Sequence, residues 1–198
     1  MEKNSFYNFV FSAKTICLKC FLNLKPTYFH WKENGISFLA IYPYEQAFQS
    51  LLYQYKGCGD IELAPCFLER INMFLRLFFR GYRIVYAPSF SSKIEERGFD
   101  HVPLLFQGLR LPILNLFQKT HDVKQSSQSK SERKKVGKYI RLTNGEEIRG
   151  KKILFVDDVF TTGSTARACI KLLLKHHPKK VAALILAKVP KNRKTATS

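Results

Sequence analysis

One stretch of sequence decides the fold: ILFVDDVFTTGST, Ile153–Thr165. Its first four residues are apolar, as expected of a strand buried on both faces of a parallel sheet. Residues 165–174 then show a helical pattern, with apolar residues spaced three and four apart along one side. A second apolar run covers residues 181–187. Strand, helix and strand in this order form a βαβ unit, which predicts an α/β fold with a parallel sheet.

The loop between this strand and the helix has the chemistry of an anion site. Ligands of open α/β sheets bind beyond the carboxyl ends of the strands, where backbone N–H groups at the start of a helix attract anions. Gly163 lets the backbone approach such an anion closely. Four hydroxyls add further donors, those of Thr161, Thr162, Ser164 and Thr165.

Two carboxylates, Asp157 and Asp158, stand just before this loop. Neighbouring carboxylates accept hydrogen bonds from a vicinal diol or hold the water shell of a divalent cation. A phosphate site beside a diol site describes the binding of a ribose 5-phosphate. A P-loop nucleotide site and a dinucleotide fold are excluded, because neither GxxxxGK[ST] nor GxGxxG occurs.

This stretch resembles the phosphoribosyl pyrophosphate (PRPP) signature of type I phosphoribosyltransferases. The resemblance implies that Asp157 and Asp158 hold the ribose hydroxyls together with Mg²⁺, and that residues 161–165 bind the 5-phosphate. If the chain is an enzyme, the implied reaction displaces pyrophosphate at C1 of the ribose. The sequence contains no motif for recognising an acceptor, so it identifies no catalytic residue and leaves turnover open.

More of the chain, roughly residues 40–190, is similar to the competence protein F (ComF) family. The similarity is carried by Tyr42-Pro43-Tyr44 with Leu52, Tyr55-Lys56 and Gly59-Asp60, by Ala87-Pro88 with Glu96-Arg97-Gly98-Phe99, and by KQSSQSKSER at 124–133. It implies a cytoplasmic protein, in the cytosol or at the inner face of the membrane. Such a protein would handle single-stranded DNA during natural transformation, with competence proteins as partners. At Asp100-His101 the sequence departs from the Asn-Gln that the family often has.

The resemblance implies two further site segments. The expected pyrophosphate loop consists of Ser89, Phe90, Ser91, Ser92 and Lys93, with Arg97 nearby. A flexible hood that closes over the reacting carbon is expected to contribute Lys124, Gln128, Lys130 and Arg133. Two other interpretations of this segment remain. It could bind the phosphates of single-stranded DNA, or it could be a solvent-exposed charged segment that binds no ligand.

The N-terminal residues 1–40 are expected to form a small extension before a phosphoribosyltransferase-like domain at 41–198. The family usually begins with two CxxC pairs that bind a structural zinc, but here only Cys17 and Cys20 match, with His30 a conceivable third ligand. Tetrahedral zinc needs four ligands. Both a zinc site and a degenerate knuckle without metal are therefore open.

Composition is consistent with this interpretation. The 198 residues suffice for one compact domain with a small appendage. The 33 Lys and Arg residues exceed the 15 Asp and Glu residues, and the net charge of +18 favours polyanionic partners such as nucleic acid, phosphorylated metabolites or an anionic membrane surface.

The odd count of five cysteines fits a reducing cytoplasm better than a disulfide framework. The apolar stretch at 6–24 is interrupted by Lys14 and Lys19, so neither a membrane span nor a signal peptide is predicted.

Patterning predicts most of the remaining elements. Helices are expected at 44–56, 61–80 and 165–174, strands at 82–87, 112–117, 153–156 and 181–187, loops at 89–98 and 119–138, and a β-hairpin turn at Asn144-Gly145.

Three functions remain open at this point. The preferred one is a ComF-like protein that binds PRPP or a phosphoribosyl group during DNA uptake. The alternatives are a phosphoribosyltransferase of nucleotide salvage, which would transfer to a free base, and a catalytically inactive PRPP-binding regulator, which would bind without turnover.

Overall fold

A computed structural model describes residues 16, 18–119 and 139–190 of the chain. The strands are β1 Phe29–Glu33, β2 Ile36–Pro43, β3 Tyr82–Tyr86, β4 Ile113–Leu114, β5 Phe117–Lys119, β6 Ile140–Leu142, β7 Lys152–Phe160 and β8 Lys180–Lys188. The α-helices are α2 Leu18–Asn23, α3 Gln46–Gly57, α4 Asn72–Phe78, α5 Ser91–Arg97, α6 His101–Phe106 and α7 Ser164–Leu174. The 3-10 helices are η1 Ile61–Phe67, η2 Gln107–Leu109 and η4 Gly145–Ile148.

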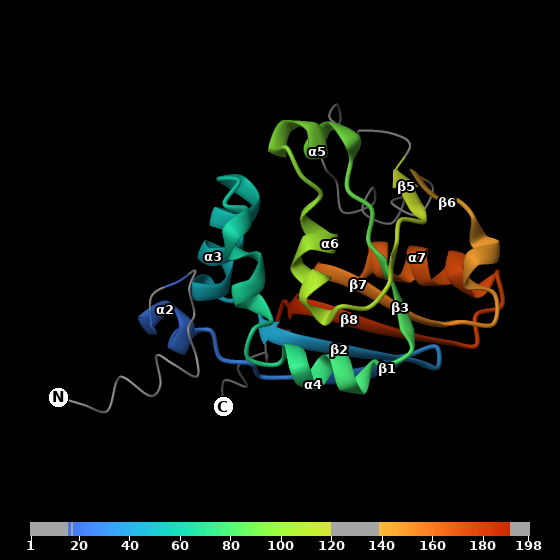
Figure 1. Ribbon diagram of the computed structural model, residues 1–198, viewed down its shortest axis with the longest axis horizontal. Helices are drawn as coiled ribbons and strands as arrows, with labels where there is room; N and C mark the ends of the chain where they lie inside the picture. The colour runs from blue at the N-terminus through green and yellow to red at the C-terminus, as the bar shows by residue number, and fades with distance from the viewer. Residues whose placement is uncertain (1–15, 17, 120–138, 191–198) are drawn as a thin grey trace, which may run out of the picture.

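Six strands form the main sheet in the order β1-β2-β8-β7-β3-β4 (Figure 1). All neighbours in it are parallel except β1 and β2, which form an antiparallel hairpin. A second, two-stranded sheet pairs β5 with β6. The predicted α/β fold with a mainly parallel sheet is confirmed. The predicted βαβ unit is β7, α7 and β8, in which β7 pairs directly with β8.

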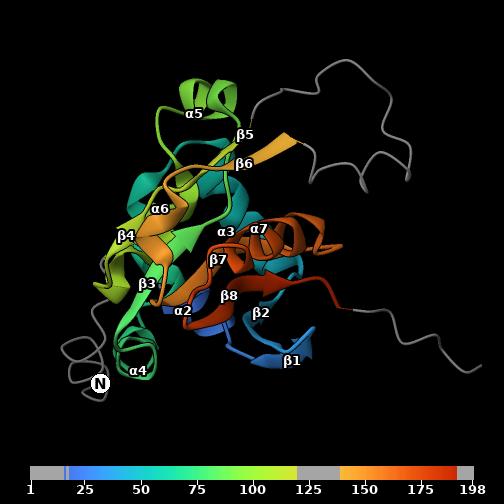
Figure 2. The same ribbon diagram turned by 90° about the vertical axis from the view of Figure 1, so that its right-hand side faces the viewer.

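Each face of the sheet has its own apolar core. Alternate residues of β7 point to opposite faces, so Ile153 and Phe155 pack against α7, while Leu154 and Val156 pack against α3, η1 and α6. Figure 2 shows α7 on one side of the strands and α4 and α6 on the other. The βαβ unit therefore has helices on both faces, and the carboxyl ends of its strands form one rim of the molecule.

The segment predicted as a loop at 89–98 contains the helix α5 instead. None of its seven side chains is fully buried, so the sequence of this segment has no apolar stripe from which a helix could be predicted. The helix begins at Ser91, carries an exposed Lys93–Glu96 ion pair at 2.9 Å, and ends at Gly98, whose φ of +81° stops the helix. This helix closes one side of the site described below.

The predicted hairpin at Asn144-Gly145 is wrong, and a hairpin occurs at Asn34-Gly35. Asn34 and Gly35 have φ of +48° and +78° and join β1 to β2 in two residues, as a type I′ turn requires. Asn144 also has a positive φ, but it precedes the 3-10 helix η4. The strand before it, β6, pairs with β5 and not with residues 146–148.

Two other predicted elements are divided. The helix expected at 61–80 is η1 followed by α4, because Pro65 lies inside its first half and interrupts regular α-helical bonding. Its predicted inward stripe is nevertheless buried: Leu68, Ile71, Leu75 and Phe79. The strand expected at 112–117 is β4 in the main sheet and β5 in the small one.

The N-terminal part of the chain contributes to the main sheet. The boundary predicted at residue 40 falls within β2, which pairs with β8 from Ser37 to Pro43. As a statement about domains, the division into 1–40 and 41–198 stays a prediction. Among the described residues, no helix has both the length and the apolar character that crossing a bilayer requires.

Candidate phosphoribosyl site

A cavity of about 240 Å³ lies beyond the carboxyl ends of β3 and β7. The side chains that line it come from α3, the β3–α5 connection, α5, α6, β5, β7 and α7, and include Lys56, Ser89, Phe90, Lys93, Arg97, His101, Lys119, Asp157, Asp158 and Thr165. Four of these are cations and two are carboxylates, so the cavity carries an excess of positive charge. Such a cavity suits an anionic ligand that also has hydroxyl groups.

Asp158 is the buried member of the acidic pair, with 8% of its surface exposed. Its Oδ1 accepts a hydrogen bond from the Val159 N–H at 2.7 Å. Its Oδ2 accepts from the Lys56 ammonium and lies 3.1 Å from His101 Nε2. Burial alone would raise the pKa of this carboxyl, but the hydrogen bond from His101 and the charge and hydrogen bond of Lys56 hold the pKa well below its ordinary value. Asp158 therefore stays ionised with both oxygens engaged.

Asp157 is the member of the pair that is available to a ligand. Its Oδ1 accepts from the Asp158 N–H at 2.9 Å, and the side chain lines the cavity. Burial and then the neighbouring Asp158 charge raise the pKa of Asp157 well above its ordinary value. A hydroxyl or a cation brought by a ligand would satisfy a carboxylate that the protein itself leaves poorly stabilised.

His101 joins three elements at the base of the cavity. Arg97 Nη1 lies 2.9 Å from His101 Nδ1, and a guanidinium only donates, so Nδ1 is the acceptor and Nε2–H donates to Asp158. Arg97 Nε also donates to the Lys56 backbone oxygen at 2.8 Å. From α3, the Tyr55 hydroxyl donates to the His101 backbone oxygen at 2.7 Å. These bonds hold Lys56 and His101 in position beside Asp158.

Phe90 and Lys119 also line the cavity. The Lys119 ammonium lies 4.6 Å from the centre of the Phe90 ring. Burial lowers the pKa of Lys119, because a desolvated ammonium favours its neutral form. An anionic ligand in the cavity would give this ammonium the negative partner that burial makes favourable.

The loop before α7 is fixed by contacts with Phe160 and Arg167. Gly163 has φ of +73° and lies over the Phe160 ring. Arg167 donates to the Thr162 backbone oxygen and to both oxygens of Glu33 on β1, at 2.8 and 3.1 Å. The Ser164 N–H donates to Thr162 Oγ1 at 3.4 Å, and the start of a helix offers further N–H donors of the kind that bind anions.

Comparisons with known proteins agree with this geometry. The family "phosphoribosyl transferase domain" matches residues 94–197. Competence protein ComFC of Streptococcus pneumoniae is 31% identical over 154 residues, which are 78% of this chain and 69% of that protein. The chain belongs to the ComF family of phosphoribosyltransferase-like proteins. The resemblance proposed from the sequence is thus confirmed.

Two more distant similarities accompany this ComF-family match. Competence protein ComFC of Bacillus subtilis is 27% identical over 138 residues, covering 69% of this chain and 57% of that protein. Among solved structures, a hypoxanthine-guanine phosphoribosyltransferase from Bacillus anthracis is 17% identical, with a TM-score of 0.41 over 70% of this chain and 74% of that chain.

The structure gathers only part of the ComF site that the sequence predicts. The predicted residues that line the cavity are Ser89, Phe90, Lys93, Arg97, Asp157, Asp158 and Thr165. Those that do not line it are Ser91, Ser92, Thr161, Thr162, Gly163 and Ser164. The hood residues Lys124, Gln128, Lys130 and Arg133 lie outside the described residues.

Three cavity residues with a basic side chain were not predicted as members of the site. His101 carries no ligand spacing in the sequence, although it replaces a residue of the family pattern. Lys56 occurs in a segment that served only to identify the family, and Lys119 ends a three-residue strand. No periodicity marks these positions, because long-range packing alone brings them to the acidic pair.

The predicted zinc ligands are not tested. Cys17 lies outside the described residues, and Cys20 is exposed. Within the described part of the chain, no group of three or more His, Cys, Asp or Glu side chains is placed to hold a metal ion. Zinc at Cys17 and Cys20 stays a prediction.

Proposed function

We propose that the cavity binds PRPP or a closely related phosphoribosyl compound. The observation that carries the proposal is the placement of Asp157 in one small cavity with Thr165 and four cationic side chains. Asp157 would accept hydrogen bonds from the ribose hydroxyls, and residues 161–165 would bind the 5-phosphate at the start of α7. Lys93 and Lys119 would contact the diphosphate.

Within this proposal, Asp158, Arg97 and His101 are positioning residues. Asp158 already uses both oxygens within the protein, so it fixes Lys56 and His101 and keeps a negative charge beside Asp157. Arg97 donates to Lys56 and lies against His101, which favours a structural role over direct contact with pyrophosphate. Lys119 would contact the diphosphate, because Lys56 and Lys93 already pair with Asp158 and Glu96.

Mg²⁺ is the cofactor that phosphoribosyltransferases generally use. The residues present fit it through one carboxylate, since Asp157 lines the cavity while Asp158 is saturated by protein donors. Mg²⁺ is commonly bound by one or two carboxylates together with substrate phosphates and waters. When bound, the ion would neutralise charge on the diphosphate.

Calorimetric titration with PRPP and Mg²⁺ tests the proposed ligand. We expect the wild-type chain to bind, and Asp157→Asn and Lys119→Met to weaken binding by about tenfold or more, because each removes one ligand contact of about 1.4 kcal/mol or more. Glu146→Gln is the matched carboxylate-to-amide control, since Glu146 is exposed on η4 outside the cavity. Equal binding by all four proteins, or no binding by a folded wild type, would contradict the proposal.

We further propose that this ComF-family chain serves DNA uptake in the cytoplasm, at the inner face of the membrane, through contact with single-stranded DNA and competence proteins. The names of the ComFC relatives and the net charge of +18 support this role. Affinity for single strands should then fall with salt, with a slope of about −0.7 per phosphate neutralised. A flat salt response would exclude electrostatic DNA binding.

Turnover distinguishes the possible reactions. Release of pyrophosphate with a free base as acceptor would identify a salvage enzyme, and release that requires single-stranded DNA would link the reaction to uptake. PRPP binding without release in either assay would identify a regulator. Each assay should include Asp157→Asn, so that contaminating activity is recognised.

A further inference from the structure

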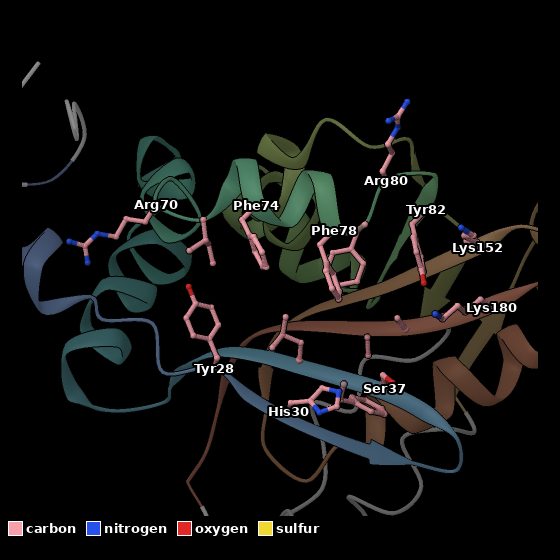
Figure 3. Close-up of a pocket in the computed structure, with 16 residues that line it drawn as sticks. Tyr28, His30, Ser37, Arg70, Phe74, Phe78, Arg80, Tyr82, Lys152 and Lys180 are labelled. Atoms are coloured by element: carbon pink, nitrogen blue, oxygen red, sulfur yellow. The ribbon is translucent and has the colours of Figure 1, made fainter. Parts of the chain in front are cut away.

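A second cavity, of about 840 Å³, lies at the opposite end of the sheet from the phosphoribosyl site (Figure 3). We call it the α4 groove; it lies between α4 and the sheet and is lined by Tyr28, His30, Ser37, Phe38, Leu39, Arg70, Ile71, Phe74, Phe78, Phe79, Arg80, Tyr82, Lys152, Lys180, Ala182 and Ala183. Tyr82, Lys152 and Lys180 are the first residues of β3, β7 and β8. The groove thus opens at the amino ends of the parallel strands and shares no residue with the other cavity.

Phe74 and Phe78 of α4 form one wall of the groove, on an apolar helix face that the described residues leave exposed and that Met73 and Leu77 extend outside the groove. Four of the seven residues of α4 are large, apolar and exposed: Met73 at 71%, Phe74 at 62%, Leu77 at 66% and Phe78 at 64%. Positions i, i+1, i+4 and i+5 fall on one side of a helix, opposite the side that buries Leu75. Figure 3 shows Phe74 and Phe78 pointing from α4 toward the strands. A patch of this kind marks a binding surface in soluble proteins.

Opposite this wall, the sheet presents mostly small side chains. Ser37 on β2 lies beside Ala182 on β8 in register, and Leu39 lies two residues further along β2 on the same face. Parallel sheets bury both faces under helices, and within the described residues no helix fills the space between α4 and this part of the sheet. Aromatic side chains on one side and mostly small side chains on the other form a groove that can accommodate the apolar face of a further helix.

The charged residues around the groove indicate the chemistry of the partner that it would bind. Among the described residues that line it are Arg70, Arg80, Lys152 and Lys180, and none is Asp or Glu. Arg70 lies at one end, where its guanidinium lies 4.2 Å from the centre of the Phe21 ring and donates to the Leu24 backbone oxygen at 3.4 Å, and the other three lie at the far end (Figure 3). Within the described residues, none of the four forms an ion pair with a carboxylate. The groove therefore offers an apolar centre between two positive ends.

We propose that the α4 groove binds an acidic amphipathic helix of a partner protein. Apolar residues at i, i+3 or i+4, and i+7 of that helix would pack between Phe74, Phe78 and the sheet, and its Asp and Glu residues would pair with the cations at both ends. A second copy of the chain is disfavoured, because a two-fold contact would bring the same cations together at a net charge of +18 per chain. A bilayer is disfavoured because a flat surface does not fill a concave groove.

Selection from a displayed peptide library tests the partner's chemistry. The full chain is the bait, and the Phe74→Ser/Phe78→Ser variant removes peptides that bind elsewhere. Both side chains are mostly exposed, so the variant should fold, and far-UV circular dichroism checks this. We expect enrichment of peptides with Asp or Glu flanking apolar residues at helical spacing. No enrichment over the variant, or enriched peptides without acidic residues, would overturn the proposal.

Fluorescence anisotropy with an enriched peptide then tests the contacts. Phe78→Ser and Lys180→Gln should each weaken binding by about tenfold or more, as anchor residues do. Tyr53→Ser and Lys179→Gln are matched controls, since both residues are exposed but do not line the groove, and they should leave binding unchanged. Equal losses in controls and groove variants would overturn the assignment.

Two further measurements identify other occupants. If vesicles of phosphatidylglycerol and phosphatidylcholine bind the wild type but not Phe74→Ser/Phe78→Ser, and no peptide is enriched, the groove is a membrane surface and the helix proposal fails. If sedimentation shows a dimer that the same double variant abolishes, the occupant is a second copy and the proposal fails equally.

Discussion

Asp158→Asn is expected to lower the free energy of unfolding by about 2 kcal/mol at pH 7, whereas Asp157→Asn is expected to leave it unchanged or raise it. Asp158 pairs with Lys56 and accepts from His101, so its loss leaves two groups at the base of the cavity with a weaker partner. Asp157 is a half-buried carboxyl group, and burial and the neighbouring Asp158 charge disfavour its ionised form, so an amide removes an unfavourable interaction. Both variants should weaken PRPP binding by about tenfold or more.

The direction of the pKa shifts gives the pH dependence of this difference. The pKa of Asp158 is lowered by folding, so its contribution is present above the unfolded value near 4 and is lost as the pH falls through its folded pKa. The pKa of Asp157 is raised, so its contribution is lost as the pH rises through its folded pKa. The two variants should therefore differ most at neutral and higher pH and converge in acid.

Urea unfolding measures the contrast. With a slope of about 2 kcal/mol per molar urea, Asp158→Asn should shift the midpoint down by about 1 M. Glu146→Gln, in an exposed pair with Arg149, should shift it little. If Asp157→Asn proved as destabilising as Asp158→Asn, the two carboxylates would not have the separate roles assigned to them.

Local patterns in the sequence were sufficient for the central βαβ unit, because a buried strand, a Gly-containing loop and an apolar helix stripe each leave a short-range signal. The predicted strand ends at Val156, whereas β7 continues through Asp157 and Asp158 to Phe160. Lys56 and His101 reach the same point from α3 and α6, and that juxtaposition depends on tertiary packing between distant segments. No spacing in the chain records it.

The two Asn-Gly dipeptides also show that local sequence does not determine which distant segments pair. Each has Asn at positive φ, yet only Asn34-Gly35 joins two paired strands. The turn residues permit a hairpin, but the flanking strands must also find each other, and β6 is paired with β5 instead. Similarly, the buried stripe of α4 was predicted, whereas its exposed apolar face was not, because both faces contain the same residue types.

Gly163→Ala is expected to destabilise the chain by about 3 kcal/mol and to weaken PRPP binding by about tenfold or more. Part of the loss comes from the positive φ of this residue, which a Cβ disfavours. The larger part comes from Phe160, because a Cβ at residue 163 would overlap its ring. That ring packs against Trp31 and Phe38, with ring centres 5.1 and 5.8 Å away, so it has little freedom to move. The phosphate loop would have to shift instead.

Gly150→Ala separates these two causes. Gly150 has a similar φ of +66°, but a Cβ there would meet no atom within 4 Å. Gly150→Ala should lower the free energy of unfolding by about 1 kcal/mol and leave PRPP binding unchanged. In a Phe160→Leu background, where the smaller side chain makes room, Gly163→Ala should cost little more than Gly150→Ala does. If Gly163→Ala cost no more than Gly150→Ala in the wild-type background, Phe160 would not restrain the loop. The close approach of backbone and phosphate would then have to rest on the Arg167 contacts alone.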